Sequence, residues 1–273
     1  MSNPSVQKMQ CMEVWGGNRA TWSQFTVPGL DVWVYSRPLK DSAGGGDVYY
    51  LSSCASGRIT RMLLADVSGH GAEVSPVAVG LRDMMRRNVN IISQSKMAAA
   101  LNDQFGGTER FATALMSTFF SPTRSLSFAS AGHPPALVFR QKQRRWVSVE
   151  DETSDGRNMP IGVVEDATFA SAKIKLELGD LVFSYTDALF EAKDSTGDIL
   201  RTSGLISVLN EVDVDQPATL INDVLERIGS INDQNLQTDD VSVMLARANG
   251  TGVSLKDNIL APFRLLASKI RRS

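Results

Sequence analysis

Aspartates stand at the ends of apolar runs, where neighbouring strands would bring their carboxylates together. Asp47 immediately precedes the run 48–54, and Asp66 immediately follows the run 59–65. The connection at 55–58, Ala-Ser-Gly-Arg, is typical of a hairpin. In an antiparallel pair the start of one strand lies beside the end of the other. Asp47 and Asp66 are therefore predicted to be neighbours.

A second set of aspartates repeats this arrangement. Asp187 ends the run 181–186, and Asp239 and Asp240 stand just before the run 241–246. If these two strands pair antiparallel, their aspartates also share one end of a sheet. Each aspartate taken alone is explained as well by turn chemistry, so the set as a whole carries the prediction.

Several carboxylates at one place indicate a cation site. Two like charges about 4 Å apart repel by roughly 4 kcal/mol at an effective dielectric constant near 20. Such a cluster needs raised pKa values or bound cations, and oxygen ligands favour Mg²⁺ or Mn²⁺. The only histidines are His70 and His133, which excludes a His-rich zinc site. Two ions could activate a water for displacement at phosphorus.

The pattern of elements favours antiparallel sheets with separate helices. Helices are predicted over 74–85, 96–105 and 217–228. Between and around them, hairpin-forming runs dominate, which argues against an alternating βαβ fold. The predicted strands cover 31–36, 48–54, 59–65, 111–120, 125–131, 136–140, 145–149, 168–176, 180–186 and 241–247.

Composition narrows the function classes. The 273 residues suit one large domain or two small ones, and the net charge of -2 gives no reason to expect nucleic-acid binding. Two unclustered cysteines favour a reducing cytoplasm. No apolar run approaches the length of a membrane span, so no transmembrane segment is predicted.

An ordered series of short motifs gives the chain a family resemblance. The motifs are, in chain order, Gly45-Gly-Asp47, Asp66-Val-Ser-Gly-His-Gly71, Ala129-Ser-Ala-Gly-His-Pro-Pro135, Pro160-Ile-Gly162, Leu178-Gly-Asp-Leu181, Tyr185-Thr-Asp187, Glu191-Ala192 and Asp239-Asp-Val-Ser242. With them the chain closely resembles the SpoIIE/RsbU-type bacterial branch of the PPM (protein phosphatase 2C-like) serine/threonine phosphatases, over about residues 31–247.

This resemblance implies an α+β fold and a metal site. The fold would be a four-layer α-β-β-α sandwich of two antiparallel sheets flanked by helices. Asp66 would bridge two Mn²⁺ or Mg²⁺ ions, and Asp47 and the carbonyl of Val67 would bind one of them. Asp187 and Asp239 would hold the other, and a water bridging the ions would attack phosphoserine or phosphothreonine. Asp66 and Asp187 are the expected catalytic residues.

Some residues depart from the family pattern or are open to two interpretations. Tyr50 replaces a usual acidic residue, which would alter the outer shell of the metal, and Ala188 replaces a usual glycine. Arg37 is a candidate for binding the substrate phosphate, although a surface arginine beside Pro38 is the simpler interpretation. A proton-donating role for His70 competes with a structural one, and His133 is interpreted as structural.

The resemblance also implies partners and a division of the chain. The substrate would be a phosphorylated bacterial regulatory protein, of which an anti-sigma-factor antagonist is one candidate; a separate activator protein and a homodimer remain open. The alternative function is a degenerate phosphatase fold that binds a phosphoprotein. A nucleotide-cyclising enzyme, which the Gly-Gly-Asp triplet suggests, is rejected because Val48 and Tyr49, and no acidic residue or Phe, follow Asp47 directly. The predicted parts are an N-terminal extension at 1–30, the phosphatase domain at 31–248 and an amphipathic basic helix or tail at 249–273.

Overall fold

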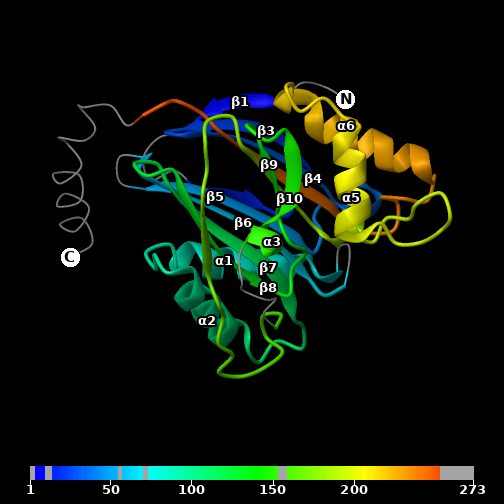
Figure 1. Cartoon of the computed structure of the whole chain (residues 1–273). Helices are drawn as coiled ribbons and strands as arrows, with labels where there is room; N and C mark the ends of the chain where they lie inside the picture. The colour runs from blue at the N-terminus through cyan, green and yellow to red at the C-terminus, as the bar shows by residue number, and fades with distance from the viewer. Residues whose placement is uncertain (1–3, 10–13, 55–56, 70–72, 153–158, 253–273) are drawn as a thin grey trace.

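Two stacked β-sheets form the centre of the protein, and helices lie outside them (Figure 1). The computed structural model describes residues 4–9, 14–54, 57–69, 73–152 and 159–252. The strands are β1 Ser5–Lys8, β2 Val14–Gly17, β3 Thr21–Val27, β4 Leu30–Arg37, β5 Asp47–Cys54, β6 Ile59–Val67, β7 Ala112–Phe120, β8 Ser125–Ala131, β9 Leu137–Arg140, β10 Arg145–Ser148, β11 Ala172–Lys175, β12 Leu181–Tyr185 and β13 Val241–Ala248. The helices are α1 Ser75–Arg87, α2 Gln94–Phe105, α3 Val149–Glu152, α4 Asp187–Phe190, α5 Arg201–Asn210 and α6 Pro217–Ile231, with a 3₁₀ turn at Leu39–Asp41.

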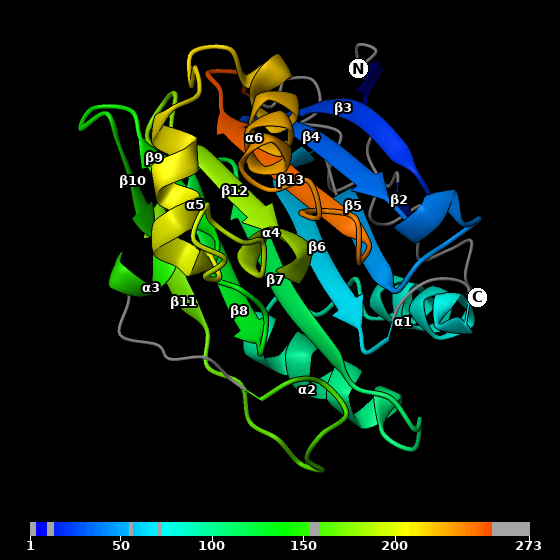
Figure 2. The same cartoon turned by 90° about the vertical axis from the view of Figure 1, so that its right-hand side faces the viewer.

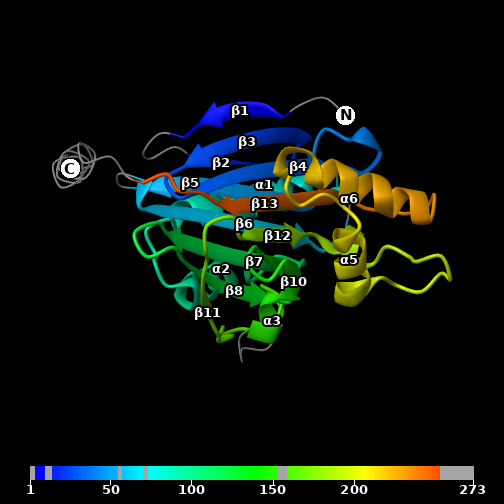
Figure 3. The ribbon, with the colours of Figure 1, turned by 45° about the horizontal axis from the view of Figure 1, so that its top comes forward.

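The strand order places residues from distant parts of the chain side by side. One sheet has the order β1-β3-β4-β13-β12-β9-β10, and the other has the order β11-β8-β7-β6-β5-β2. Strand pairing is antiparallel except between β1 and β3, which are parallel. β1, β3 and β4 lie together at one side of the first sheet (Figure 3).

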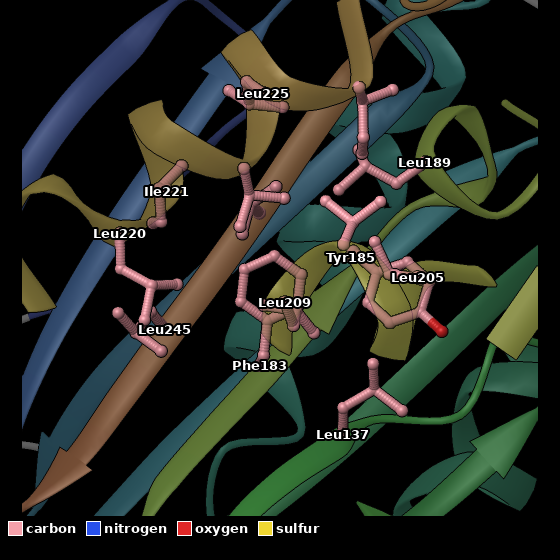
Figure 4. Packing of buried hydrophobic residues seen from close by; sticks show 14 of the residues in the cluster. Leu137, Phe183, Tyr185, Leu189, Leu205, Leu209, Leu220, Ile221, Leu225 and Leu245 are labelled. Atoms are coloured by element: carbon pink, nitrogen blue, oxygen red, sulfur yellow. The ribbon is translucent and has the colours of Figure 1, made fainter. Parts of the chain in front are cut away.

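Three buried clusters fill the spaces between four layers. One lies between α5, α6 and the first sheet, the second between the two sheets, and the third between the other sheet and α1 and α2. In the first cluster Phe183 and Tyr185 of β12 pack with Leu205 and Leu209 of α5 and with leucines of α6 (Figure 4). Burying each such side chain contributes roughly 1.5–3 kcal/mol. These clusters hold the two sheets and the helices together, and so support the strand ends at which the aspartates lie.

Local sequence explains where the principal helices begin and which face they bury. Proline stands in the first turn of both α1 and α6, where its missing N–H has no helical partner to lose. In α6, Leu220, Ile221, Val224, Leu225 and Ile228 recur at helical spacing and are buried. α5 and α6 lie in front of the sheets in Figure 2. The apolar face of α6 packs against the first sheet.

The predicted fold class, a four-layer α-β-β-α sandwich, is confirmed, as are the main predicted hairpins. Helix α5 was not predicted. The runs 168–176 and 180–186 hold β11 and β12, which lie in different sheets. Residues of the predicted N-terminal extension form β1, β2 and β3, which pair within both sheets. The predicted limits of the phosphatase domain, 31–248, stay predictions. Residues 253–273 of the predicted basic helix lie outside the described residues. In the part of the chain that the structure describes, no helix is long and apolar enough to cross a membrane.

Candidate metal centre

Asp47 and Asp66 face each other across a hairpin. Asp47 is the first residue of β5, and its Cα partner in the β5–β6 ladder is Asp66. The side chain of Asp47 is 3% exposed, and that of Asp66 is partly buried. The prediction that these two residues are neighbours is confirmed.

The second set of aspartates lies at the same end of the sandwich. β12 and β13 pair antiparallel, and the ladder is extended by a hydrogen bond from Thr186 N to the Ser242 carbonyl at 3.0 Å. Asp187 therefore lies beside the residues that precede β13. Thr186 Oγ1 donates a 2.8 Å hydrogen bond to Asp47 Oδ2, which joins this end of the first sheet to the Asp47–Asp66 hairpin.

Burial and mutual repulsion raise the pKa values of these carboxyls. The pKa of Asp66 is raised to about 10, first by burial and then by the charges of Asp47, Asp187, Asp239 and Asp240. Burial, followed by the charge of Asp240, also raises the pKa of Asp47. The pKa of Asp187 is raised to about 6 by burial and by Asp239. The five aspartates thus form one electrostatically coupled group.

This coupling predicts an unusual dependence of stability on pH. Above about pH 4 the unfolded chain releases the Asp66 proton, whereas the folded protein retains it up to its pKa of about 10. The free energy of unfolding in EDTA is therefore expected to fall as pH rises from 7 to 9. The loss is up to about 1.4 kcal/mol per pH unit for each retained proton. Denaturant titrations across this range measure it.

Two other groups with shifted pKa values contribute little to the change in stability between pH 7 and 9. Asp187, with a pKa of about 6, has lost its proton below pH 7. His133, whose pKa burial lowers to about 3, affects stability only below about pH 6.5, where the unfolded histidine becomes protonated. Asp66→Asn should make the decline between pH 7 and 9 shallower, and Asp47, whose pKa is also raised by burial and by the charge of Asp240, contributes the rest. A decline of equal slope in that variant would contradict the assignment to Asp66.

Asp240 has a structural role that the sequence did not separate from that of Asp239. Its side chain is 2% exposed, and its carboxylate accepts hydrogen bonds from Gly46 N at 2.6 Å and from Leu39 N at 2.5 Å. Asp239 is only partly buried, and its Oδ1 accepts a hydrogen bond from Asp240 N. Asp240 thus fixes the backbone in front of Asp47.

The carbonyl of Val67 lies beside the backbone that precedes Asp47. Val67 N donates to the Gly46 carbonyl at 3.2 Å, and a Cβ added at Gly46 would lie 2.9 Å from the Val67 oxygen. This carbonyl and the Asp47–Asp66 pair therefore belong to one small region, and their role as ligands, which the family resemblance implies, stays a prediction.

Arg37 lies at the side of Asp239. It is the last residue of β4, and its guanidinium donates a hydrogen bond to the Leu236 carbonyl. Both residues line a cavity of about 100 Å³ together with Lys40 and Asp239. The arginine is therefore near the aspartate group, with part of its donor capacity used by the backbone.

The other residues singled out from the sequence, where the structure describes them, are buried or belong to short helices near the aspartates. His133 is fully buried, and its Nδ1 is 2.9 Å from the hydroxyl of Thr113, the strand partner of Asp66. Tyr50 packs in the apolar cluster under α1 and α2. Ala188 is the second residue of α4, so the glycine it replaces is not needed for a left-handed conformation. His70 lies outside the described residues.

The donor set fits hard divalent cations. Asp66 is surrounded by four further carboxylates, whose charges a cation would offset, and carboxylate and carbonyl oxygens are the ligands that Mg²⁺ and Mn²⁺ prefer. In the part of the chain that the structure describes, no three such side chains are grouped closely enough to hold an ion as they stand. The hydrogen bond from Thr186 to Asp47 Oδ2 holds the Asp47 carboxylate in one orientation.

This sandwich with aspartates at one end has the fold of the PP2C-type phosphatases. A structure of the PP2C phosphatase domain and a fragment of the regulatory domain of the cell fate determinant SpoIIE from Bacillus subtilis matches with a TM-score of 0.66 at 16% identity, over 88% of this chain and 64% of that chain. The family model described as Stage II sporulation protein E (SpoIIE) matches residues 56–249. The chain belongs to the SpoIIE family.

Two further proteins are similar to this chain. Phosphoserine phosphatase RsbU of Bacillus subtilis (strain 168) is 20% identical over 222 residues, which are 80% of this chain and 63% of RsbU. This chain thus spans less than two thirds of that relative. RsbX, whose crystal structure is in complex with magnesium, matches with a TM-score of 0.62 at 12% identity, over 84% of this chain and 100% of that chain.

Proposed function

We propose that the protein is a metal-dependent serine/threonine protein phosphatase. The observation that carries this proposal is the group of five aspartates, in which Asp66 faces Asp47 and is coupled to Asp187, Asp239 and Asp240. The SpoIIE family model and the phosphoserine phosphatase activity in the name of RsbU support it.

Four of these aspartates would hold the metal ions, namely Asp47, Asp66, Asp187 and Asp239. Asp66 would bind two Mg²⁺ or Mn²⁺ ions, with Asp47 and the Val67 carbonyl on one and Asp187 and Asp239 on the other. Bound ions would supply an activated bridging water and would neutralise charge on the phosphoryl oxygens. The chain itself contributes the orientation of the ligands, through Thr186 on Asp47 and through the backbone bonds of Asp240.

The substrate would be phosphoserine or phosphothreonine on a bacterial regulatory protein, such as an anti-sigma-factor antagonist. Arg37 is the proposed contact for the phosphate, since it borders the same cavity as Asp239 and a guanidinium matches phosphate geometry. A separate activator protein and a homodimer belong to the same proposal.

The second candidate function is a phosphoprotein-binding module without catalysis. It is favoured by the arrangement of the described carboxylates, which do not form a ready-made ligand group, and by the absence of an acidic residue at Tyr50. Against it stands the complete set of Asp47, Asp66, Asp187 and Asp239, since binding a phosphate gains nothing from grouped negative charges.

Hydrolysis of p-nitrophenyl phosphate and of a phosphoserine peptide separates these functions. With Mn²⁺ or Mg²⁺ we expect turnover of both, and EDTA should abolish it because the carboxylates alone cannot activate water. A phosphotyrosine peptide serves as a comparison for residue specificity. Absence of turnover together with no Mn²⁺ binding by calorimetry would overturn the enzyme, and preferential binding of the phosphoserine peptide would then favour the binding module.

A further inference from the structure

Three successive glycines precede the proposed metal ligand Asp47. We call Gly44–Gly46 the glycine loop. Glycine has the greatest backbone freedom of any residue, so this loop by itself would leave the start of β5 poorly fixed. The position of Asp47 must therefore be set by contacts that other segments make with the loop.

Asn18 makes two hydrogen bonds to this loop and further contacts beside it. Its carbonyl accepts a hydrogen bond from Gly45 N at 2.9 Å, and its side-chain Nδ2 donates to the Gly45 carbonyl at 2.9 Å. Nδ2 also lies 2.8 Å from Ser75 Oγ and 3.3 Å from the Ser75 carbonyl, at the start of α1. The carbonyl partners require the amide nitrogen to face the loop.

The surroundings leave little room for another arrangement. Asn18 is 4% exposed, and β2, which ends one residue before it, pairs with β5 so that Gly17 lies opposite Tyr49. A Cβ added at Gly44 would lie 2.6 Å from Ser75 Oγ and 3.0 Å from Asn18 Nδ2. The glycine loop is thus in close contact with Asn18 on one side and with Asp240 on the other.

We propose that Asn18 is a positioning residue for Asp47. It binds both polar groups of Gly45 and connects the glycine loop to α1, so that Asp47 starts β5 opposite Asp66. This inference rests on the proposed function, because it assigns Asn18 a role in metal binding. Residues that orient a metal ligand typically change metal affinity 10- to 100-fold when they are replaced.

Asn18→Asp tests the role directly, because it keeps the side-chain shape but removes the N–H donors. We expect the Kd for Mn²⁺, measured by calorimetry, to rise about 10-fold. In the metal-free protein, amide hydrogen exchange of peptides covering 42–50 should become faster. Ser75→Ala, which leaves the bonds to Gly45 in place, should bind Mn²⁺ nearly as wild type does.

Asn102→Asp is a matched control. Asn102 is 3% exposed, and its amide donates to the Val164 carbonyl and accepts from Gly162 N, two partners outside the glycine loop. This variant should lose comparable thermal stability without a change in the Kd for Mn²⁺. Unchanged exchange or an unchanged Kd in Asn18→Asp, with wild type binding Mn²⁺, would overturn the positioning role alone. Failure of wild type to bind Mn²⁺ would overturn the proposed function as well.

Discussion

Asp66→Asn is expected to lower kcat/KM for the phosphoserine peptide on the order of 10³-fold at saturating Mn²⁺, a loss typical of removing one preorganised electrostatic group. Asp66 is the carboxylate to which all four neighbouring aspartates are coupled, and no other residue is proposed to contact both ions. Initial rates over a Mn²⁺ titration measure the effect and show whether extra metal restores activity.

The same variant should be at least as stable as wild type in EDTA at pH 7. The pKa of about 10 means that the metal-free Asp66 carboxyl is protonated there, and an amide replaces a neutral group of nearly the same shape. Asp103→Asn, at an exposed position on α2, is the control and should retain wild-type rates. Near-normal turnover by Asp66→Asn would contradict the proposed metal centre, and a large loss of stability would show that Asp66 supports the fold instead.

Gly45→Ala is expected to weaken Mn²⁺ binding 10- to 100-fold and to destabilise the protein by about 1–3 kcal/mol. A Cβ at this position would lie 2.3 Å from Oδ2 of Asp240, whose carboxylate is held by two backbone N–H groups. Because Asp240 cannot move away without losing those bonds, the glycine loop must shift and carry Asp47 with it. Calorimetric Mn²⁺ titration and denaturant unfolding give the two quantities.

Gly229→Ala provides the matched comparison for this substitution. Gly229 lies within α6, and a Cβ there would meet no atom within 4 Å. Alanine should therefore stabilise the protein by about 0.5–1 kcal/mol without affecting Mn²⁺ binding. If Gly45→Ala behaved like Gly229→Ala, the contact between the glycine loop and Asp240 would have no role in placing the ligand.

Local patterns were sufficient to predict the core of the site. The short connection between the runs 48–54 and 59–65 fixes a hairpin register, and that register alone places Asp47 beside Asp66. The pairing of β12 with β13 could only be stated as a condition, because 55 residues separate Tyr185 from Val241 and no turn joins the strands. In both cases the prediction rested on the aspartates that stand at the ends of the strands.

The residues that the sequence did not reveal act through contacts between distant segments. Asp239 and Asp240 are adjacent and of the same type, and only the bonds from Leu39 and Gly46 distinguish the buried one. Asn18 belongs to no motif and contacts Gly45 from 27 positions away. Helix α5 has a short apolar pattern and begins at Arg201, whose φ is 53°, so its start carries no usual helix signal.

The central place of β13 has a consequence for how the protein is made. β13 lies between β4 and β12, and it pairs with residues 30–37 and with residues 181–185, which are far apart in the sequence. On the ribosome, β4 can pair with β3 at once, but its second partner β13 is synthesised only about 200 residues later. The first sheet, and with it the aspartate group, can therefore assemble only after the strand that follows Asp240 has been synthesised. A nascent chain that lacks β13 would contain Asp47 and Asp66 but could not yet form the proposed metal centre.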